Sequence, residues 1–304
     1  MTQQLIAGFG EALVDVLPSG EVVGGAPLNF AIRVAELSAI ADCRAALVSR
    51  LGADERGEKV LARLSTTSLD TSAVQVDSRM QTGYVDVTLE DGQPSYTIGD
   101  EVAWDAIAWD ERVAELAHEA AAVCFGTLVQ RHHASRLTLQ RFLETASAAH
   151  KILDINIRKP FPNMDVIACS LQSADILKCN EDELLHLAEC LRLDATESSL
   201  EIAAELQQKF HLRAVFWTRG AQGCRWQEGR TILDGSVPQL PADPQADSVG
   251  AGDAASAALA VGLTVGWAPE RIVRAANLCG AFAASRRGPT APLTADVLRS
   301  LASE

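Results

Sequence analysis

Residues 247–253, with the sequence DSVGAGD, stand directly before an alanine-rich stretch at 254–265 that has the composition of a helix. Small residues before a helix let a ligand approach the backbone, and the amides and dipole of the first turn attract a phosphoryl group. Asp253 would repel a permanently bound anion, but its carboxylate could accept the proton of an attacking hydroxyl. Phosphoryl transfer needs both parts together. The alternative is a glycine-rich loop that ends in a helix-capping aspartate.

A second polar segment, NEDE at 180–183, follows a short apolar string at 176–177. Asn180 and Glu183 have the spacing of a capping-box variant, in which each side chain bonds the backbone at the other end of the first turn. An acidic helix start could also hold the water shell of Mg²⁺, which needs few direct protein ligands. The two interpretations are compatible.

Two glycines at 24–25 precede a proline-initiated helix, and Asn29 follows in its expected first turn. Backbone access beside an amide that both donates and accepts hydrogen bonds suits a polyol. Asp15, which follows the first predicted strand, would add an acceptor for paired hydroxyls. Alternatively, Asp15 and Asn29 are ordinary turn residues.

Two further polar strings end predicted strands, DINIR at 154–158 and TRGAQG at 218–223. Ligands of parallel α/β sheets bind outside the carboxyl ends of the strands, so both strings are expected on the ligand side. Arg158 could hold a phosphate or carboxylate with two hydrogen bonds, and a helix-terminal ion pair is the alternative.

Several familiar signatures are absent from the sequence. The string GFGEAL at 8–13 lacks the third glycine of a dinucleotide fingerprint, which argues against an NAD enzyme. Residues 52–59 begin like a P-loop, but they end in Glu-Lys in place of Lys-Ser/Thr. There is no G-x-S-x-G or H-E-x-x-H motif.

The charge balance also excludes classes of partner. Forty Asp and Glu residues against 26 Lys and Arg give a net charge of −14, which argues against nucleic acid and anionic membranes as partners. Seven cysteines are scattered without a C-x-x-C pair, as expected for reduced thiols. The N-terminus lacks the pattern of a signal peptide, and no apolar run approaches ~18 residues. We therefore expect a cytoplasmic protein.

Short apolar strings alternate with amphipathic stretches along the 304 residues. The expected strands are 5–7, 46–48, 122–125, 152–155, 176–177 and 214–217. The expected helices include 55–64, 135–149, 181–191 and 200–210. This alternation predicts an α/β fold in which a mostly parallel sheet is covered by helices on both faces.

Residues 82–90 break this pattern because polar and apolar residues alternate strictly, and Asp91-Gly92 then turns the chain toward 95–98. The pattern predicts a half-exposed antiparallel hairpin beside the main sheet. Such a flap could close over a ligand or form a subunit contact, and simple decoration is the alternative. We expect one large domain plus this flap, and a homodimer that covers the apolar face of the flap.

The ordered set of motifs, from about Gly8 to Leu293, resembles the ribokinase-like (PfkB-type) carbohydrate kinases. The resemblance implies a three-layer α/β/α sandwich over 1–304 with a small antiparallel β-lid at 81–104 that also uses parts of 11–24. It implies a small-molecule sugar as acceptor, ATP as donor, Mg²⁺ and, in many members, a monovalent cation such as K⁺.

The resemblance also assigns roles to matching positions in this sequence. Asp253 is similar to the catalytic base and Arg158 to the family arginine near the transferred group, with anion-hole amides from Gly250, Ala251 and Gly252. The implied sugar contacts are Asp15, Gly25, Asn29 and Asn156. The implied nucleotide contacts are Lys178, Thr218, Gly220, Gly223 and Asn277, the last against the adenine. The implied metal contacts are Asn180 and Glu183 for Mg²⁺ through water, and Asp247 with the 283–288 segment for a monovalent cation.

The opening GEALVD at 10–15 is most similar to the fructokinase branch, so the expected reaction is phosphorylation of a hydroxymethyl group of fructose or a related ketose. The lid sequence GQPSYTI at 92–98 lacks the basic and aromatic residues that fructokinases commonly place there. The alternatives are a 2-keto-3-deoxygluconate kinase, a ribokinase-type activity, and a non-catalytic sugar- or nucleotide-binding protein on the same fold.

Overall fold

The structure is a computed structural model that describes residues 3–90, 93–158, 161, 163–195 and 198–303, with side chains for all of these except 87–90 and 93–95. The predicted turn at Asp91-Gly92 lies outside the described residues.

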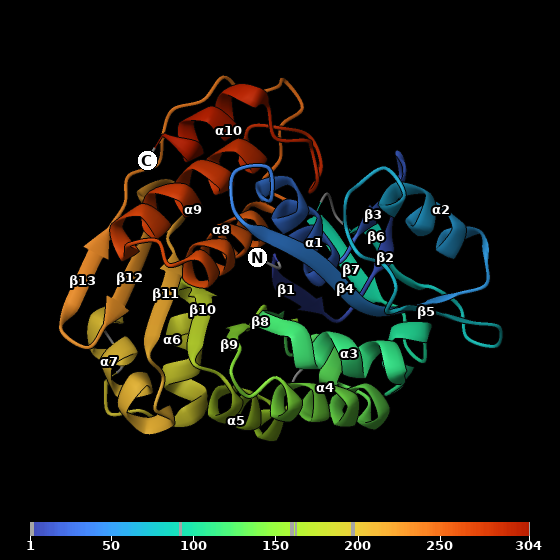
Figure 1. The fold of residues 1–304 in the computed structure, drawn as a ribbon, viewed down its shortest axis with the longest axis horizontal. Coiled ribbons are helices and arrows are strands. Elements are labelled where there is room, and N and C mark those ends of the chain that lie inside the picture. The colour runs from blue at the N-terminus through green and yellow to red at the C-terminus, as the bar shows by residue number, and fades with distance from the viewer. Residues whose placement is uncertain (1–2, 91–92, 159–160, 162, 196–197, 304) are drawn as a thin grey trace.

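A nine-stranded sheet forms the centre of the molecule, in the order β13-β12-β11-β10-β9-β8-β1-β4-β5 (Figure 1). In chain order its strands are β1 Gln4–Phe9, β4 Cys43–Gly52, β5 Val74–Asp77, β8 Ala120–Phe125, β9 His150–Asp154, β10 Ile176–Asn180, β11 Ala214–Thr218, β12 Cys224–Glu228 and β13 Thr231–Asp234. All neighbours from β5 to β11 pair in parallel, whereas β12 and β13 add an antiparallel edge. The prediction of a mostly parallel sheet is confirmed, and the edge hairpin was not predicted.

Helices cover both faces of this sheet, because the side chains of each central strand alternate between two cores. On β1, Ile6 points into a core under α1, α8 and α9, whereas Leu5 and Phe9 point into the opposite core under α3, α4, α6 and α7. The helices are α1 Ala26–Leu37, α2 Glu55–Leu64, α3 Glu111–Glu119, α4 His133–Thr145, α5 Met164–Ser173, α6 Glu181–Leu191, α7 Ser199–Phe210, α8 Ala251–Val265, α9 Pro269–Ala284 and α10 Ala295–Ala302. No helix of the described residues is both long and apolar enough to cross a bilayer.

The helix predicted at 135–149 is wrong at its end, because α4 stops at Thr145. Ala146 leaves the helical conformation with φ −77° and ψ 48°, and β9 begins at His150. The four residues between them must reverse the chain, so this tertiary requirement overrides the helix propensity of the alanines. The other three predicted helices, α2, α6 and α7, agree with the sequence to within one residue.

A second, four-stranded sheet lies beside the main one, in the order β3-β2-β6-β7. Its strands are β2 Leu13–Leu17, β3 Gly20–Gly24, β6 Gly83–Glu90 and β7 Gln93–Ile98. The pair β6–β7 is antiparallel, as expected of the predicted hairpin, and β6 joins β2 in parallel. The sheet is therefore built from two segments far apart in the chain.

Candidate functional site

Helix α8 begins at a left-handed glycine. Gly250 is its N-cap with φ 79° and ψ −2°, and no side chain of the described residues caps the helix. A Cβ atom at Gly250 would lie 2.6 Å from the carbonyl oxygen of Pro289, so a larger residue could not keep this turn. The Ala251 amide, which was predicted to face an anion, donates instead to the Ser248 carbonyl oxygen at 3.2 Å, because the turn before the helix closes on itself. The amides of Gly252 and Asp253 have no acceptor among the described residues and are left for a ligand. An anion fits this helix start because the dipole and the amides act together.

Asp253 lies in the first turn of α8 and meets a side chain from a distant part of the chain. The Nδ2 group of Asn29 donates a hydrogen bond of 2.8 Å to Oδ2 of Asp253. Asn29 is held by α1, whose N-cap is Gly25 with φ 112°, and α1 packs beside α8 in the same core. Oδ1 of Asn29 is buried and has no hydrogen-bond partner among the residues that the structure describes. A buried acceptor without a donor indicates a missing polar ligand, as a sugar hydroxyl would be.

The pKa of Asp253 is raised to about 6, first by burial and next by the neighbouring Asp154 carboxylate. The hydrogen bond from Asn29 and the charges of Lys178 and Arg158 oppose this rise. A carboxylate with this pKa is mostly ionised at neutral pH and is a stronger base than an ordinary aspartate.

Asp154 and Lys178 form a buried ion pair next to the α8 turn. They are neighbours in the β9–β10 register, and the Nζ group of Lys178 donates to both carboxylate oxygens at 2.9 and 3.0 Å. Ser256 of α8 donates a further hydrogen bond of 2.7 Å to Asp154. Nζ of Lys178 also lies 3.0 Å from where a Cβ of Gly252 would be. Lys178, predicted to bind nucleotide, therefore stands beside the anion site with its charge paired to Asp154.

The charge of Arg158 acts on three carboxyl groups, those of Glu11, Asp15 and Asp253. Arg158 lowers the pKa values of Glu11, Asp15 and Asp253, although burial, the larger effect, raises all three above their ordinary values. Asp15 reaches over Gly24, where a Cβ would lie 2.8 Å from its Oδ2. The structure thus connects Asn29 with Asp253 directly, and Arg158 with Asp15 and Asp253 through its charge, whereas the sugar contacts of Asp15, Gly25 and Asn29 stay a prediction.

Asn156, another predicted sugar contact, and Glu11, which was not predicted, line one narrow pocket. Asn156 has a positive φ of 41°, which is uncommon outside glycine and is found at functional sites. The signal for Glu11 was present in the sequence, since it is a carboxylate within an otherwise apolar segment, GFGEALV.

The capping box at the start of α6 is confirmed. Oδ1 of Asn180 accepts from the Glu183 amide at 2.8 Å, and Oε2 of Glu183 accepts from the Asn180 amide at 2.9 Å. Oε1 of Glu183 also accepts from the Ile157 amide at 2.9 Å, which ties the Arg158 segment to α6. Each carboxylate oxygen has a lone pair left, so this acidic helix start fits a hydrated Mg²⁺.

The predicted nucleotide turn follows β11. Gly223 has φ 79°, and a Cβ there would lie 2.1 Å from the Gly235 carbonyl oxygen. Asn277, only 3% exposed, accepts a hydrogen bond from the Cys224 amide and donates one to the Val273 carbonyl. The side-chain amide of Asn277 therefore holds in place the turn that follows Thr218 and contains Gly220. The contact of Asn277 with adenine stays a prediction.

Asp247 links the loop before α8 to the segment after α9. Its carboxylate accepts from the amides of Val249 and Gly288, both at 3.0 Å. The structure therefore places Asp247 against the 283–288 segment, where the cation was predicted. Carboxylate and loop carbonyl oxygens are a suitable donor set for such an ion.

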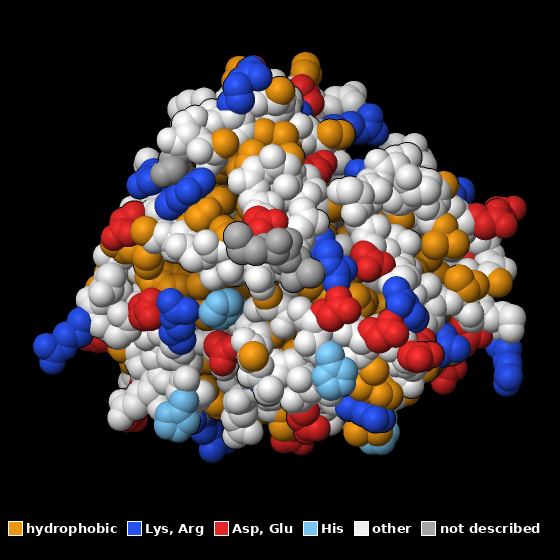
Figure 2. Space-filling model, viewed as in Figure 1, with side chains coloured by type: hydrophobic (Ala, Val, Ile, Leu, Met, Phe, Trp, Pro, Cys, Tyr) orange, Lys and Arg blue, Asp and Glu red, His pale blue; other side chains and the backbone are white. Residues whose placement is uncertain are grey.

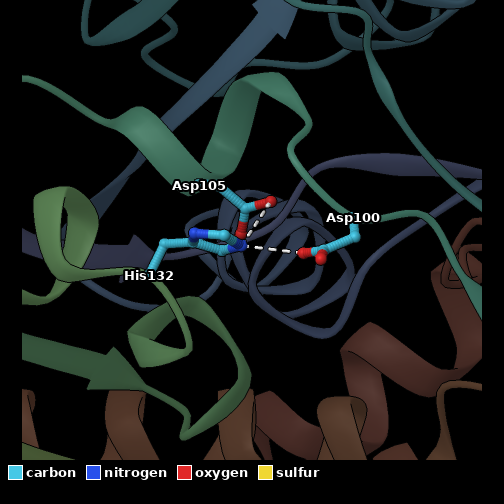
Figure 3. A group of neighbouring side chains, drawn as sticks. All are labelled: Asp100, Asp105 and His132. Carbon is cyan, nitrogen blue, oxygen red and sulfur yellow. Dashed lines mark hydrogen bonds and ion pairs between the residues drawn. The ribbon is translucent and has the colours of Figure 1, made fainter.

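A group of side chains outside this site also has metal-ligand chemistry. Asp100, Asp105 and His132 lie together, and Nε2 of His132 is 2.7 Å from Asp100 and 3.7 Å from Asp105 (Figure 3). Arg131, however, donates to both oxygens of buried Asp105, at 2.7 and 2.6 Å, and to the Gly99 carbonyl. The Arg131 guanidinium supplies the positive charge that a metal ion would otherwise supply to Asp105. These hydrogen bonds anchor the segment after β7 to the residues that precede α4.

The chain is similar in sequence to known proteins. The model of the pfkB family carbohydrate kinases matches residues 11–296. A Pyrococcus horikoshii protein named as a sugar kinase is 29% identical over 93% of this chain and 91% of its own length. Fructokinase-1 of Zea mays is 29% identical over 98% of this chain and 97% of its own length.

Solved structures agree with this similarity. The crystal structure of the Pyrococcus horikoshii sugar kinase matches with a TM-score of 0.80 and 26% identity, over 98% and 97% of the two chains. The fructokinase of Xylella fastidiosa with bound ATP has the same fold, with a TM-score of 0.79 and 23% identity over 99% and 98% of the two chains. The predicted fold class is therefore confirmed, and the chain belongs to the pfkB family of carbohydrate kinases.

Proposed function

We propose that this carbohydrate kinase transfers the γ-phosphoryl group of ATP to a hydroxymethyl oxygen of fructose or a related ketose. The single observation that carries the proposal is the meeting of Asn29 and Asp253. The side-chain oxygen of Asn29 is buried without a hydrogen-bond donor among the described residues, and its side-chain nitrogen donates to the carboxylate of Asp253. This carboxylate lies at the start of α8, which no side chain of the described residues caps. This arrangement combines a polyol contact, a base and an anion site. The fructokinase names among its relatives support a ketose as the acceptor.

In the proposed reaction, Asp253 accepts the proton of the sugar hydroxyl through its Oδ1 while Asn29 holds Oδ2. The sugar oxygen forms a bond to the γ-phosphorus as the bond between that phosphorus and the β–γ bridging oxygen breaks, and ADP leaves. The amides of Gly250, Gly252 and Asp253 stabilise the charge on the transferring group. Lys178 and Arg158 add positive charge nearby, as their effects on the pKa of Asp253 indicate.

Asn180 and Glu183 would hold Mg²⁺ through its waters, and the ion supplies charge neutralisation for the phosphates. Asp247 would contribute to a monovalent cation site beside the α8 turn. Thr218, Gly220 and Gly223 would line the nucleotide phosphates, with Asn277 behind them.

The four-stranded sheet would act as a lid that excludes water from the reaction. The chain would work in the reducing cytoplasm, which agrees with seven cysteines that are all unpaired.

The test is ADP release with ATP and Mg²⁺ against fructose, tagatose, ribose, 2-keto-3-deoxygluconate, adenosine and fructose 6-phosphate. Turnover with fructose or tagatose should fall by about 10²–10⁴-fold in Asp253→Asn, the range for loss of a general base. The matched control is Asp296→Asn, which makes the same change at an exposed helix start and should keep full activity. Near-full turnover in Asp253→Asn would remove Asp253 from the base role. No turnover of any ketose would overturn the proposed substrate.

A further inference from the structure

We infer that Asp154 and Ser256 are positioning residues that hold the ammonium group of Lys178 at the start of α8, where it binds the γ-phosphoryl group of ATP. The inference rests on the proposed function and concerns the same site. The three side chains come from β9, α8 and β10 and meet inside the protein, since Asp154 and Lys178 are each 6% exposed and Ser256 is fully buried. Neither Asp154 nor Ser256 is among the site residues predicted from the sequence.

Asp154 fixes the direction of the Lys178 side chain. Its two carboxylate oxygens accept from Nζ at 2.9 and 3.0 Å, so the ammonium cannot turn away without losing one of these bonds. Ser256 holds the carboxylate in turn, with its Oγ 2.7 Å from Oδ2. The same Oγ lies 3.0 Å from the carbonyl oxygen of Gly252, and its single proton goes to the carboxylate, which is the stronger acceptor. The network therefore joins the ammonium to the first turn of α8.

One N–H of Lys178 is left for a ligand. An ammonium has three donors, and those of Lys178 reach no acceptor other than Asp154 among the described residues. Nζ lies 3.0 Å from where a Cβ of Gly252 would be, so the third N–H is beside the free amides of Gly252 and Asp253. These donors at one helix start match a phosphoryl group, whose charge is spread over three oxygens during transfer.

The ion pair is better explained by this position than by stability. Two buried charges lose their water, so such a pair contributes little net free energy of folding. Asp154 instead allows a cation to be buried at the anion site before any ligand arrives. The transferring group then meets an ammonium that is already in place, which costs no reorganisation during the reaction.

Three substitutions and one control test this network. Lys178→Met removes the ammonium, Asp154→Asn removes the charge that holds it, and Ser256→Ala removes only the hydroxyl. The matched control is Thr264→Val, because the Thr264 hydroxyl also donates to the carbonyl oxygen four residues before it on α8, at 2.8 Å, and has no bond to Asp154 in the described part of the chain. The measurements are kcat and KM for fructose, the Kd of a non-hydrolysable ATP analogue with Mg²⁺, and urea unfolding.

Lys178→Met should lower kcat by about 10²–10³-fold, the range for loss of one donor to the transition state. Asp154→Asn should lower kcat by about tenfold or more and Ser256→Ala by about threefold to tenfold, with the KM for fructose within about twofold of wild type. Lys178→Met and Asp154→Asn should each raise the Kd of the analogue by about threefold or more. Thr264→Val should change none of these values.

The losses should also be coupled. In the Lys178→Met background, Ser256→Ala should change kcat by less than about twofold, because the ammonium that Ser256 helps to position is gone. Asp154→Asn should cause no further loss in that background, for the same reason. If Asp154→Asn does not fold, Ser256→Ala carries the test, since it leaves both charges of the ion pair in place.

The pH profile separates this positioning from a purely structural role. The charges that act on Asp253 are those of Asp154, Lys178 and Arg158, and Glu11 interacts with it as well. Burial raises the pKa of Asp253 most, and repulsion from Asp154 raises it next. Asp154→Asn should therefore move the acid limb of kcat/KM to lower pH, whereas Ser256→Ala should leave the limb in place. A merely structural loss would lower the rate equally at every pH.

Equal losses from Ser256→Ala in the wild-type and Lys178→Met backgrounds would overturn the inference, and so would unchanged binding of the analogue in Lys178→Met. A higher KM for fructose at unchanged kcat in Asp154→Asn would place Asp154 at the sugar instead. Wild-type turnover with no sugar would reject the proposed function. Weaker binding of the analogue by Lys178→Met would in that case still support Lys178 at the phosphates, so the two failures are distinguishable.

Discussion

Asp253 must be ionised to accept a proton, and its environment decides at which pH that happens. Burial and Asp154 raise its pKa to about 6, whereas the hydrogen bond from Asn29 favours the ionised form and holds the pKa below what burial alone would give. Asn29 therefore has two roles in the proposed site, since it holds the sugar through Oδ1 and tunes the base through Nδ2.

The pH profile tests this assignment. Because only ionised Asp253 can act as a base, kcat/KM for fructose should be high above pH ~7 and should be lost as the pH falls through about 6. Glu11→Gln, which removes the second carboxyl that ionises near neutral pH, should keep this acid limb. Asn29→Ala should move the limb to higher pH, because the carboxylate loses a donor. A limb near pH 4, or one that Asn29→Ala leaves in place, would contradict the assignment.

At the level of elements, the start of α8 depends on one backbone conformation. Gly250 and Gly266 cap the two ends of this helix and have nearly the same φ, 79° and 74°. Their surroundings differ, since a Cβ at Gly250 would meet Pro289, whereas a Cβ at Gly266 would have no atom of the described residues within 4 Å.

These two glycines form a matched pair of substitutions. Both Gly250→Ala and Gly266→Ala should lose about 1–2 kcal/mol of stability from the left-handed conformation. Gly250→Ala should also lower turnover by about 10–10³-fold, because the Pro289 contact displaces the amides of the anion site. Gly266→Ala should keep wild-type turnover. Urea unfolding and ADP release measure the two effects, and equal turnover in both variants would argue against an anion site at Gly250.

The segment after β7 is held by the buried pair of Asp105 and Arg131, whose side chains are 3% and 0% exposed. Asp105→Asn should lower the free energy of unfolding by about 3–5 kcal/mol, because it removes the buried counter-charge of the guanidinium and leaves only the exposed Asp100, 3.9 Å away. Asp296→Asn breaks an exposed pair with Arg299 and should leave stability almost unchanged. Thermal and urea unfolding compare the two variants. Similar stabilities would show that Asp105 does not anchor this segment.

At the level of the whole molecule, the four-stranded sheet has an exposed strand at its edge. β7 is its last strand, and Tyr96 on that strand is 65% exposed. Acidic and basic side chains are interspersed on the face seen in Figure 2, so that face offers no broad basic surface to a polyanion. We propose that a second copy of the chain covers the exposed β7 edge of this sheet.

Sedimentation over a range of concentrations tests this dimer. The wild-type chain should sediment as a dimer at micromolar concentrations, and Tyr96→Lys should raise the dissociation constant by about tenfold or more, because it puts a charge into an apolar contact. Leu137→Lys changes another exposed apolar residue, on α4, and should leave the dimer intact. A wild-type monomer at every concentration would contradict the proposed dimer.

The sequence by itself predicted most of the central parallel strands and named most residues of the candidate site. Its apolar strings marked the parallel strands, and its glycine-rich turns marked where amides meet a ligand, because both signals are local. Asp253, Asn29 and Arg158 were found in this way, since each stands in a short motif whose geometry its neighbours set.

Only the tertiary structure decided which of these groups act on one another. The bond between Asn29 and Asp253 joins residues 224 positions apart, and the Asp154–Lys178 pair needs two strands in register. The raised pKa of Glu11 and the anchor at Arg131 depend on burial and on charges from other segments, which no local pattern contains. The end of α4 at Thr145 likewise follows from where β9 must start. Local sequence sets conformation, whereas pKa values, ion pairs and pockets arise from groups that only folding brings together.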